Sequence, residues 1–562
     1  MRGLRVVVIS GQVGAGKSTL AHGLADSYSA VQINTKELLL LTAESRGEEL
    51  EPERSALQKY GARLDEEAGG RWVADAVSGK IAGAPVAGRA VQHAEQDTGD
   101  DQPTGLYVVD SVRIKGQIDH LRDAVADVVH VHLYSSHQVL AQRYKHRGDA
   151  SGLKELSSYE EVAKDPTEQG VIDLRDDADV AIDTERSNVE DVLTRAAAAL
   201  GLLPDADARL VDVLVGGQYG SEGKGNLAFF LARQYDLLVR VGGPNAGHTV
   251  PLPTPFTHRL LPSGTQANER AKLLLGPGAT LDVDVLMTEI AQCGVESDRL
   301  SIDPQAMIIE QADLDAEQAL VAEIASTGKG GGSAAARRIL GRSSHRVDAP
   351  VRLARDVPEL AAFIRPARVV LEEAYRNGHR VLLEGTQGTA LSLYHGSWPH
   401  VTSRDTTTSG TLAEAGIGPR RIRRVILVVR TYPIRVQNPD TDGKTSGPMS
   451  QEITYEELAR RSGIPQEELE KTEKGSVSHR QRRIAEFDWA LLRRSVELNG
   501  ATDIALTFAD YISIGNRAAQ RYDQLTDETI RFIEEVERVS GVPVSLITTR
   551  FDARSVIDRR RW

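Results

Sequence analysis

Two stretches of the chain place an unbroken apolar run directly in front of clustered glycines. The first is LRVVVIS at 4–10, and the second is VDVLVGG at 211–217. Continuous runs rich in β-branched residues are typical of strands buried on both faces of a parallel sheet. The first run leads through glycines into TLAHGLADSY at 19–28, whose pattern is helical. These patterns predict an α/β chain with a parallel sheet in each half.

The two halves are separated by LLPDADARL at 202–210, where a proline and alternating acids interrupt the patterned segments. Such composition is typical of a linker. It follows the helical segment NVEDVLTRAAAALG at 188–201. A chain of 562 residues is also too long for one hydrophobic core. We therefore place a boundary near residue 206 and expect one domain over 1–203 and a second over 208–562.

Composition narrows the class of protein. The formal net charge of −13 argues against nucleic-acid or membrane-surface binding, because both need a basic face. The single cysteine, Cys293, excludes a disulfide framework and a cysteine-based metal cluster, and it fits a reducing cytoplasm. No apolar run approaches the roughly 18 residues that a membrane span requires. We expect a cytoplasmic protein that binds neither nucleic acid nor membranes.

The first glycine cluster, GQVGAGKS at 11–18, has the spacing G-x-x-x-x-G-K-[ST] of a phosphate-binding loop. Its position between a strand and a helix is the context that such a loop needs. Backbone N–H groups would surround the phosphates of a nucleoside triphosphate, Lys17 would reach the terminal pair, and Ser18 would ligate Mg²⁺. The residues expected to bind this nucleotide are Gly11, Gly14, Gly16, Lys17, Ser18 and Thr19.

Two further motifs follow the first glycine cluster along the first domain. VVDSVRIKGQIDHLR at 108–122 and HVHLYSSHQVLAQRYKHRG at 130–148 follow the loop in an order similar to dephospho-coenzyme A kinase and deoxynucleoside monophosphate kinases. The resemblance implies a P-loop kinase fold. Asp110 would assist the acceptor or magnesium, and arginines would clamp phosphates through their forked guanidinium groups. These arginines are Arg113, Arg143 and Arg147, for each of which a solvated helix face is the alternative. The acceptor is left open.

The second glycine cluster, VGGQYGSEGKGNLA at 215–228, departs from that spacing. Five residues rather than four separate Gly217 from Gly223, and a glycine instead of a hydroxyl residue follows Lys224. Further motifs follow it along the second domain: LLVRVGGPNAGHTV (237–250), FTHRLLPSG (256–264), STGKGGGSAAARRILGR (326–342), LLEGTQGTALSLYHGSWPHVTS (382–403), VVRTYPIRV (428–436), GSVSHRQRRIAEFDW (475–489) and LTFAD (506–510).

Taken together, these motifs resemble adenylosuccinate synthetase over essentially the whole second domain. GGPNAGHTV and VVRTYPIRV are closer to the compact archaeal and phage members than to the longer bacterial form. The resemblance implies a parallel-sheet ligase that acts as a homodimer, with a purine nucleotide, L-aspartate, a nucleoside triphosphate and Mg²⁺ as its partners. In such enzymes the γ-phosphoryl group is moved onto O6 of a 6-oxopurine nucleotide, and the aspartate amine then displaces phosphate.

The resemblance also implies roles for individual residues. His248 would donate to the β/γ bridge of the triphosphate, where charge develops, and Gly247 would offer its carbonyl to magnesium. The loop residues that would bind phosphate are Gly220, Glu222, Gly223, Lys224 and Gly225. Those that would hold the purine nucleotide and its 5′-phosphate are Asn245, Thr327, Gln387 and Thr402. Arg480 and Arg482 would recognise aspartate, and an arginine taken as Arg342 would cross a dimer interface to the partner's nucleotide.

Ser221 stands where the family has its catalytic aspartate. A hydroxyl, whose pKa lies far above neutrality, cannot act as a carboxylate base at N1. Three readings remain open. The domain could bind nucleotides without catalysis, or use inosine monophosphate with Glu222 or a water as base, or take a substrate that differs at C2. A guanine nucleotide carries a 2-amino group that would crowd an aspartate, whereas serine leaves room and can accept one N–H. The same substitution is associated with phage synthetases that build 2-amino-adenylosuccinate.

The expected donor-base site departs from the family too. Members select GTP with a lysine and an aspartate, and here the aspartate remains as Asp510 while Phe508 replaces the lysine. An aromatic ring still stacks on a purine but selects less. The C-terminal glycine–proline turn of the family is TTR at 548–550. GTP and an adenine triphosphate, ATP or dATP, therefore both remain candidates for the phosphoryl donor.

Overall fold

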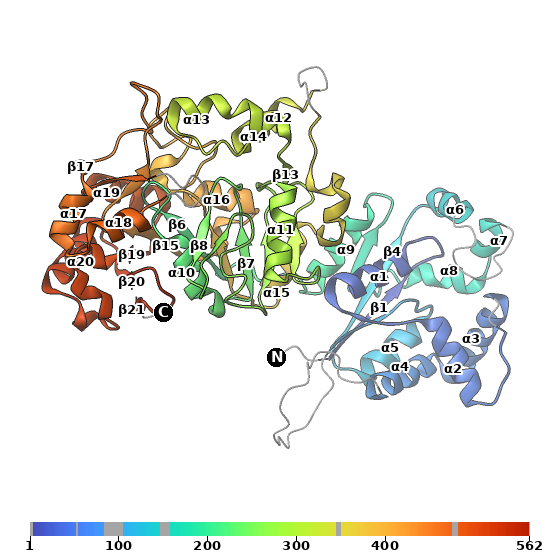
Figure 1. The fold of residues 1–562 in the computed structure, drawn as a ribbon. Helices are drawn as coiled ribbons and strands as arrows, with labels where there is room; N and C mark the ends of the chain where they lie inside the picture. The colour runs from blue at the N-terminus through green and yellow to red at the C-terminus, as the bar shows by residue number, and fades with distance from the viewer. Residues whose placement is uncertain are drawn as a thin grey trace. The chain divides into compact units, whose positions relative to one another are not determined.

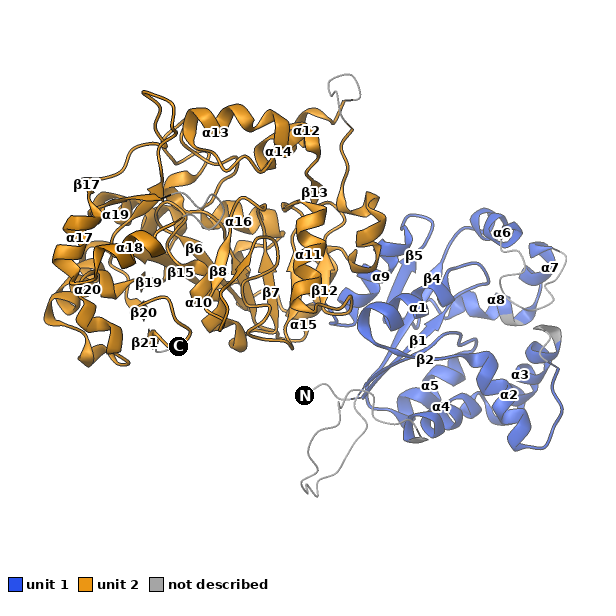
Figure 2. Ribbon diagram, in the orientation of Figure 1, with its two compact units in different colours: residues 1–203 blue, residues 204–562 orange. Residues whose placement is uncertain are grey.

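The computed structural model describes residues 4–51, 54–83, 105–146, 158–343, 350–474 and 481–560. The chain divides into two compact units, Met1–Leu203 (unit 1) and Pro204–Trp562 (unit 2), as Figure 2 shows. Both are α/β units, so the fold class expected from the sequence is confirmed.

Unit 1 is built on a parallel sheet of five described strands in the order β2-β3-β1-β4-β5. The strands are β1 (Leu4–Ser10), β2 (Val31–Ile33), β3 (Gly105–Val109), β4 (Val128–Tyr134) and β5 (Val180–Asp183). The helices are α1 (Lys17–Tyr28), α2 (Thr35–Ser45), α3 (Arg54–Ala68), α4 (Arg71–Gly83), α5 (Lys115–Ala124), α6 (His137–Lys145), α7 (Tyr159–Ala163), α8 (Pro166–Asp173) and α9 (Val189–Ala199).

The first apolar run is continuous because both faces of this sheet are covered. Val6 and Val8 of β1 pack with residues of α2, α3, α4 and α5 on one face. Val7 and Ile9 pack with residues of α1, α6 and α9 on the other. Alternate side chains of one strand therefore enter two separate cores, as a buried parallel strand requires.

Unit 2 is built on a larger sheet in which nine described strands have the order β12-β10-β7-β14-β6-β15-β19-β20-β21. Neighbouring strands in this sheet are parallel, except that β20 and β21 are antiparallel. The strands are β6 (Val211–Gly216), β7 (Leu237–Arg240), β10 (Lys272–Leu275), β12 (Leu300–Ile302), β14 (Val381–Glu384), β15 (Ile422–Arg430), β19 (Asp503–Thr507), β20 (Val544–Thr548) and β21 (Val556–Asp558).

Helices and three small sheets complete unit 2 (Figure 1). The helices are α10 (Lys224–Leu231), α11 (Val283–Cys293), α12 (Gln311–Ala316), α13 (Gln318–Ile324), α14 (Gly331–Leu340), α15 (Ala367–Arg376), α16 (Thr408–Ala415), α17 (Tyr455–Ser462), α18 (Gln466–Thr472), α19 (Trp489–Asn499) and α20 (Asp527–Ser540). The small sheets pair β8 (His248–Val250) with β9 (Phe256–His258), β11 (Thr280–Leu281) with β13 (Met307–Ile308), and β18 (Arg482–Ala485) with both β16 (Ile434–Val436) and β17 (Glu452–Ile453).

The same two-sided burial holds for the large sheet. Val213 of β6 enters a core with residues of α15, α16, α19 and α20, whereas its neighbour Leu214 enters a second core with residues of α10 and α11. The run VDVLVGG therefore forms a central strand, and the glycines at its end begin a connecting loop at the edge of the sheet.

The strand order explains why motifs spread over about 300 residues can form one site. Strands β7, β14, β6, β15 and β19 are consecutive neighbours in the sheet. Each is parallel to the next, so their carboxyl ends meet at one edge. A sequence motif follows each of these ends. Ligands of open parallel sheets bind at this edge, and the fold therefore predicts a site there.

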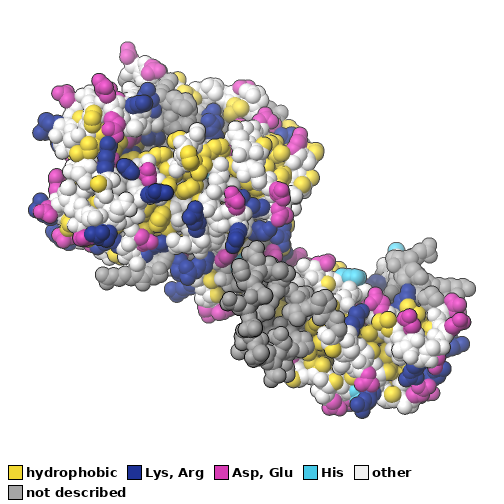
Figure 3. All heavy atoms as spheres, turned by 60° about the horizontal axis from the view of Figure 1, so that its bottom comes forward, with side chains coloured by type: hydrophobic (Ala, Val, Ile, Leu, Met, Phe, Trp, Pro, Cys, Tyr) yellow, Lys and Arg dark blue, Asp and Glu magenta, His cyan; other side chains and the backbone are white. Residues whose placement is uncertain are grey.

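The surface of unit 2 carries charges of both signs. On the face drawn in Figure 3, Lys and Arg side chains are interspersed with Asp and Glu. Within the described ranges, no helix is both long enough and apolar enough to cross a membrane.

Candidate active site

A cleft of about 740 Å³ lies at the carboxyl edge of the large sheet of unit 2. This volume is within the range of small-molecule sites. Most of the residues that the sequence singled out in this unit line it. They are Gly220, Ser221, Gly223, Lys224, Gly225, Asn245, Gly247, His248, Thr327, Gln387, Thr402, Arg482 and Asp510. The motifs thus converge on one cavity, although the role of each residue in it stays a prediction.

The second glycine loop runs from the end of β6 to the start of α10. Gly223 precedes the helix with φ of 89°, a left-handed conformation that glycine adopts without strain. No side chain caps α10, so the N–H groups of its first turn are available to an anion. A side chain at Gly225 would lie 2.8 Å from the carbonyl oxygen of Thr249, which shows how closely the helix approaches β8. The loop therefore has the geometry of a phosphate cradle despite its unusual spacing.

Glu222 faces into this loop and away from the cleft. Its Oε1 accepts hydrogen bonds from the backbone N–H groups of Gln218 and Gly220, each at 2.9 Å. Its Oε2 accepts one from Lys224 Nζ at 2.6 Å, and the side chain is 1% exposed. The carboxylate folds the loop and holds the lysine. It does not line the cavity, so its position disfavours the reading in which Glu222 removes a proton from a substrate.

Lys224 is held from three sides. Besides Glu222, its ammonium group donates to the carbonyl oxygens of Gln387 at 2.5 Å and Gly220 at 3.4 Å. These hydrogen bonds connect the loop after β6 to the segment after β14. They also fix a positive charge beside the first turn of α10.

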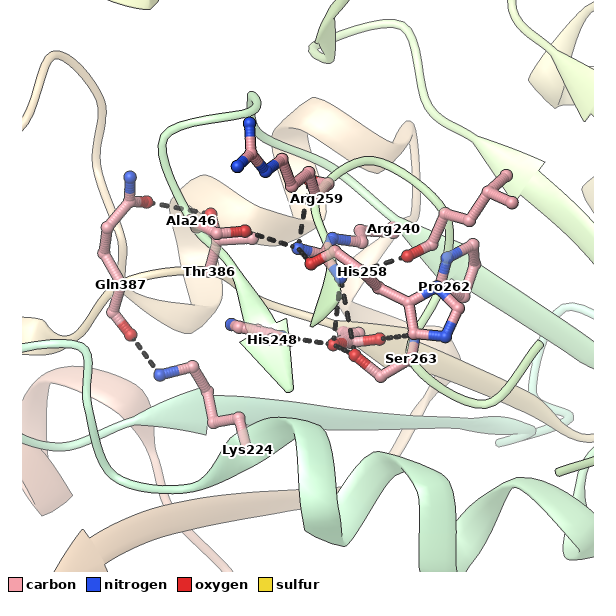
Figure 4. Close-up of polar contacts among 12 residues, drawn as sticks. Lys224, Arg240, Ala246, His248, His258, Arg259, Pro262, Ser263, Thr386 and Gln387 are labelled. Atoms are coloured by element: carbon pink, nitrogen blue, oxygen red, sulfur yellow. Dashed lines mark hydrogen bonds and ion pairs between the residues drawn. The ribbon is translucent and has the colours of Figure 1, made fainter. Parts of the chain in front are cut away.

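The ends of two neighbouring strands supply a buried ion pair beside the cleft. Arg240 ends β7, Glu384 ends β14, and the two residues are direct partners in the strand register. Arg240 donates to the backbone carbonyls of Ala246, Arg259 and Leu261 at 2.8–3.1 Å. Figure 4 shows these bonds radiating from its guanidinium group. A single buried arginine therefore fixes two loops.

Glu384 in turn orients His248. Its Oε1 lies 2.5 Å from His248 Nδ1, and its Oε2 accepts the N–H of Ser263 at 2.7 Å. Burial alone would raise the pKa of Glu384. The charge of Arg240 and the hydrogen bonds from His248 and Ser263 outweigh burial and lower this pKa to about 2. The carboxylate is therefore ionised and can only accept. Nδ1 must therefore donate the hydrogen bond to Glu384, and Nε2 remains as the ring nitrogen that could contact a ligand.

His248 is neutral at pH 7 in the protein alone. Burial and the positive charge of Arg240 lower its pKa to about 4, against the opposing effect of Glu384. Nε2 is buried and has no hydrogen-bond partner among the described residues. An anionic phosphate beside Nε2 would offset the charge of Arg240 and favour protonation there. The imidazole would then become a charged donor.

The side of the cleft that is predicted to hold the purine is formed by neutral polar groups. Gln387 has φ of 58° and directs its side-chain oxygen to the hydroxyl of Thr386 at 2.8 Å. Its amide nitrogen lies 3.4 Å from Thr402 Oγ1. Asn245 and Thr327 line the same cavity. Groups of this kind can orient a base by hydrogen bonds without fixing its charge.

Another part of the cleft lining is aromatic. Phe508 begins a turn with φ of 59°, and the Arg430 guanidinium lies 3.8 Å from the centre of its ring. Asp510 is 2% exposed; its Oδ2 accepts from Arg517, while Oδ1 has no partner among the described residues. Burial raises the pKa of Asp510 to about 6. A ring beside an orphaned carboxylate oxygen suits a purine base that presents an N–H group.

Two arginines expected at the substrates differ in placement. Arg482 lines the cleft and donates to Glu473 Oε2 at 3.2 Å. Arg342 lies outside the lining residues; it is exposed, and its Nε donates to the carbonyl of Ile339. Arg480 falls outside the described residues. The predicted role of Arg342 at a dimer interface stays a prediction.

The residues at the loop can hold magnesium only with help from a ligand. No group of three or more His, Cys, Asp or Glu side chains within the described ranges is arranged to bind a metal ion. Gly247 and Ser221 line the cleft, where a backbone carbonyl and a hydroxyl would be the donors to an ion. Mg²⁺ commonly takes few protein oxygens together with substrate phosphates. This donor set fits an ion that the triphosphate itself carries.

In unit 1 the first glycine cluster forms the loop between β1 and α1. Gly11, Gly14 and Gly16 all have positive φ, at 139°, 87° and 95°. Lys17 donates to the carbonyls of Gly11 and Gln12 at 2.6 and 3.1 Å. Ser18 and Thr19 are exposed at the start of α1. Strand, loop and helix have the arrangement that the motif requires.

The other predicted residues of unit 1 are partly engaged by protein groups. Asp110 follows β3 and accepts two bonds from Thr35 at 3.0 and 3.2 Å, and burial raises its pKa. Arg113 pairs with the buried Glu168 of α8. Arg143 donates to the carbonyl of Gly14 at 3.3 Å, which places it against the loop. Arg147 lies outside the described residues.

Sequence comparison identifies the family of unit 2. A sequence model described as adenylosuccinate synthetase matches residues 213–356 and 350–518, more than half of the chain. The chain belongs to the adenylosuccinate synthetase family. Enzymes of this family are C–N ligases whose substrates are a purine nucleotide, aspartate and a nucleoside triphosphate.

Individual relatives support the same family assignment. Adenylosuccinate synthetase of Methanococcus aeolicus is 37% identical over 357 residues, which are 62% of this chain and 99% of that enzyme. Among solved structures, succinoaminodeoxyadenylate synthetase of cyanophage S-2L is 28% identical with a TM-score of 0.53, over 63% of this chain and 96% of that one. Adenylosuccinate synthetase of Plasmodium falciparum, at 20% identity and the same TM-score over 63% and 100%, shares the fold.

The sequence did not reveal the buried charged residues that hold the side chains and loops of the adenylosuccinate synthetase site in place. Arg240, Glu384 and Arg430 were read only as parts of longer motifs. Arg240 and Glu384 are each the charged last residue of an otherwise apolar buried strand, and Arg430 ends the buried apolar part of β15. A charge at the end of such a run is a usable signal, because it reaches the carboxyl edge of the sheet where ligands bind. Thr386 carries no comparable signal, since its role depends on a partner 18 residues away.

The lowered pKa of His248 predicts a specific pH dependence of stability. The unfolded histidine has a pKa of 6.5 and the folded one about 4, so the unfolded state binds more protons between these values. Stability therefore falls as the pH falls through this window. Relative to a His248→Gln variant, wild type should lose about 2 kcal/mol of unfolding free energy between pH 7 and pH 5. Urea unfolding at both pH values measures this, and equal losses in the two proteins would contradict the assignment.

Proposed function

We propose that unit 2 joins L-aspartate to C6 of a 6-oxopurine nucleotide, with a guanine nucleotide (GMP or dGMP) as its substrate and 2-amino-adenylosuccinate, or its deoxy form, as its product. The reaction consumes a nucleoside triphosphate. Its γ-phosphoryl group passes to O6 as N1 loses its proton. The aspartate amine then bonds to C6, and the C6–O6 bond breaks to release inorganic phosphate.

The cleft offers a group for each part of this chemistry. The first turn of α10 and Lys224 bind the phosphates, and magnesium carried by the triphosphate neutralises part of their charge. His248 donates from Nε2 to the transferring phosphoryl group once phosphate has favoured its protonation. Gln387 orients the purine, and Arg482 exchanges its contact with Glu473 for a carboxylate of aspartate. A water beside Ser221 accepts the N1 proton, since Glu222 faces into the loop.

The observation that carries the guanine assignment is Ser221. The residue lines the cleft, and no partner among the described residues engages its hydroxyl. A hydroxyl there leaves space for a 2-amino group and can accept one of its N–H bonds. The cyanophage S-2L relative supports the assignment, because its solved structure is bound to dGMP.

A second candidate is the ordinary reaction of the family, with IMP as the substrate. The 37% identity to an archaeal adenylosuccinate synthetase favours it. Loss of catalysis, with nucleotide sensing as the remaining role, is the weaker alternative. The Arg240–Glu384–His248 network is intact, and binding alone does not require a histidine held in one tautomer.

The donor is proposed to be ATP or dATP. Asp510 has one oxygen held by Arg517 and one without a partner. A single free acceptor suits the 6-amino group of adenine, whereas guanine presents two adjacent donors. Phe508 supplies a stacking surface for either base. The cyanophage relative is bound to dATP as an energy donor, which supports this choice.

A substrate panel tests the ligase proposal. The full chain is incubated with aspartate, magnesium, one of IMP, GMP or dGMP, and one of GTP, ATP or dATP, and products are read by mass spectrometry. We expect a succinylated 2-amino product from a guanine nucleotide, with ATP or dATP at least as effective as GTP. No succinylated product from any nucleotide would overturn the ligase proposal, and a product from IMP alone would overturn the guanine assignment.

The variant Ser221→Asp sharpens this test. A carboxylate in place of the hydroxyl crowds the 2-amino group, and overpacking costs typically 1–3 kcal/mol. The ratio of kcat/KM for guanine over inosine nucleotides should fall roughly ten- to a hundredfold. Ser221→Ala is the matched control, because it leaves the space and should keep most of the guanine preference. An unchanged ratio in the aspartate variant would contradict the C2 argument.

We propose that unit 1 is a kinase-like unit that binds a second nucleoside triphosphate with magnesium. The loop from Gly11 to Ser18, with Lys17 at the start of α1, supports triphosphate binding. Asp110 and Arg143 lie at the ends of elements beside the loop and would serve the acceptor and the phosphates. The acceptor is proposed to be a nucleotide or nucleoside related to the ligase substrates.

Paired lysine variants separate the two sites. Calorimetric titration with a non-hydrolysable triphosphate and magnesium should give two sites per chain in wild type. Lys17→Ala and Lys224→Ala should each leave one, because each removes a charge from one phosphate cradle. Lys59→Ala, an exposed lysine of α3, is the control and should keep both. Two sites in Lys17→Ala would contradict the role of unit 1, and a loss of ligase turnover in that variant would show that unit 1 regulates the ligase instead of acting beside it.

A further inference from the structure

We propose that Arg404 and Thr386 form a hydrogen-bond relay that fixes the side-chain amide of Gln387 in one orientation, so that the cleft accepts 6-oxopurine nucleotides and rejects 6-aminopurine nucleotides. Arg404 and Thr386 are positioning residues in this account, since both act through Gln387. The inference rests on the proposed function, because it assumes that Gln387 faces the purine.

The relay is a chain of two hydrogen bonds that joins three residues. Arg404 Nη1 lies 3.1 Å from Thr386 Oγ1, and Thr386 Oγ1 lies 2.8 Å from Gln387 Oε1. Thr386 is 1% exposed, and its hydroxyl has no further partner within the described residues. Figure 4 shows the last of these contacts, with the amide nitrogen of Gln387 turned away from Thr386.

Donor and acceptor rules set the direction of the relay. A guanidinium group can only donate, so Thr386 Oγ1 must accept from Arg404. The hydroxyl proton is then available for one acceptor, and the side-chain oxygen of Gln387 is the group that can take it. If the amide were reversed, its NH₂ would face the hydroxyl, and the buried hydroxyl proton would have no acceptor. Leaving a buried donor without a partner costs roughly 1–3 kcal/mol, so the relay keeps the NH₂ group toward the cleft.

Arg404 is itself held in place. Its guanidinium pairs with Glu414 of α16, and its side chain is 12% exposed. Gly242 makes room for its contact with Thr386. A Cβ at Gly242 would lie 2.6 Å from Thr386 Oγ1 and closer still to Arg404 Nη1. Because Gly242 follows β7 and Glu414 lies in α16, separate elements converge on one arginine that does not line the cleft.

The backbone of Gln387 is equally fixed. Its carbonyl oxygen accepts from Lys224, and the carbonyl of the next residue, Gly388, accepts from Thr406 at 2.7 Å. The side-chain amide is therefore the part of Gln387 that could still turn. The relay removes that freedom as well.

A fixed NH₂ group selects the chemistry at C6 of the base. O6 of a 6-oxopurine accepts hydrogen bonds, so it can pair with the amide N–H. N7 accepts in both classes of purine, so the selection rests on O6 alone. A 6-amino group donates, and it would face another donor. The product of the proposed reaction carries an N–H at C6 where the substrate carried oxygen. The relay therefore favours substrate over product, as well as 6-oxo over 6-amino nucleotides.

The test is the ratio of dissociation constants for matched pairs of nucleotides. Calorimetry with IMP and AMP, and with GMP and 2,6-diaminopurine riboside monophosphate, keeps the group at C2 constant within each pair and changes the group at C6 together with the proton on N1. Wild type should bind the 6-oxo member at least tenfold more tightly. Thr386→Val keeps the shape but removes the hydroxyl, so the amide can turn, and the ratio should fall about tenfold through weaker 6-oxo and stronger 6-amino binding.

Thr386→Ser is the matched control, because it keeps the hydroxyl, and it should retain the wild-type ratio. Thr386→Ala repeats the test with a smaller side chain if the valine variant is unstable, and thermal unfolding of each variant monitors folding. An unchanged ratio in both the valine and alanine variants would overturn the relay while leaving the proposed function intact. Failure of wild type to bind any 6-oxo nucleotide would overturn the proposed function, and the relay with it.

Discussion

The active site depends on the buried pairing of Arg240 and Glu384 at the ends of two neighbouring strands. Arg240 uses its donors to hold the loops on either side of β8 and β9, and Glu384 uses its oxygens to hold His248 and Ser263. Removing one member of such a pair leaves an uncompensated buried charge, which costs about 3–5 kcal/mol. Replacing both residues with apolar ones would avoid that cost. It would also remove the hydrogen bonds that hold the two loops and orient His248. The pair thus serves geometry more than stability.

The same principle recurs around the cleft, where buried charges orient groups that face the substrate. Glu222 folds the phosphate loop around Lys224, and Lys224 in turn grips the backbone of Gln387. Behind the purine side, Arg404 acts on Gln387 through Thr386. Charges lie behind this purine side, whereas the groups that line it are neutral amides and hydroxyls. In the proposed reaction, this division would let the cleft distinguish bases by their hydrogen-bonding pattern. Ser221, whose hydroxyl has no partner among the described residues, would then decide which base is accepted.

Much of this arrangement could be predicted from the sequence. Continuous apolar runs predicted the central strands, glycine spacing predicted the first phosphate loop, and the resemblance to a family predicted the second. The convergence of distant motifs also follows once the strands are parallel, because their carboxyl ends share an edge. What could not be predicted is the partner of each charge. Arg240 and Glu384 are 144 residues apart, and only the strand register brings them together. The orientation of the Glu222 side chain could not be predicted either. A carboxylate in a loop can face its own backbone or the ligand, and only the packing of the loop decides between the two.

The central claim is that this framework directs a phosphoryl group onto O6 before aspartate enters. Its most direct test is the fate of the O6 atom. A guanine nucleotide labelled with ¹⁸O at O6 is converted by the full chain with aspartate and ATP, and the inorganic phosphate released is analysed by mass spectrometry. The account predicts that each phosphate carries one ¹⁸O atom from the nucleotide. Unlabelled phosphate alongside a succinylated product would contradict it, because O6 would then have left C6 without ever being bonded to phosphorus.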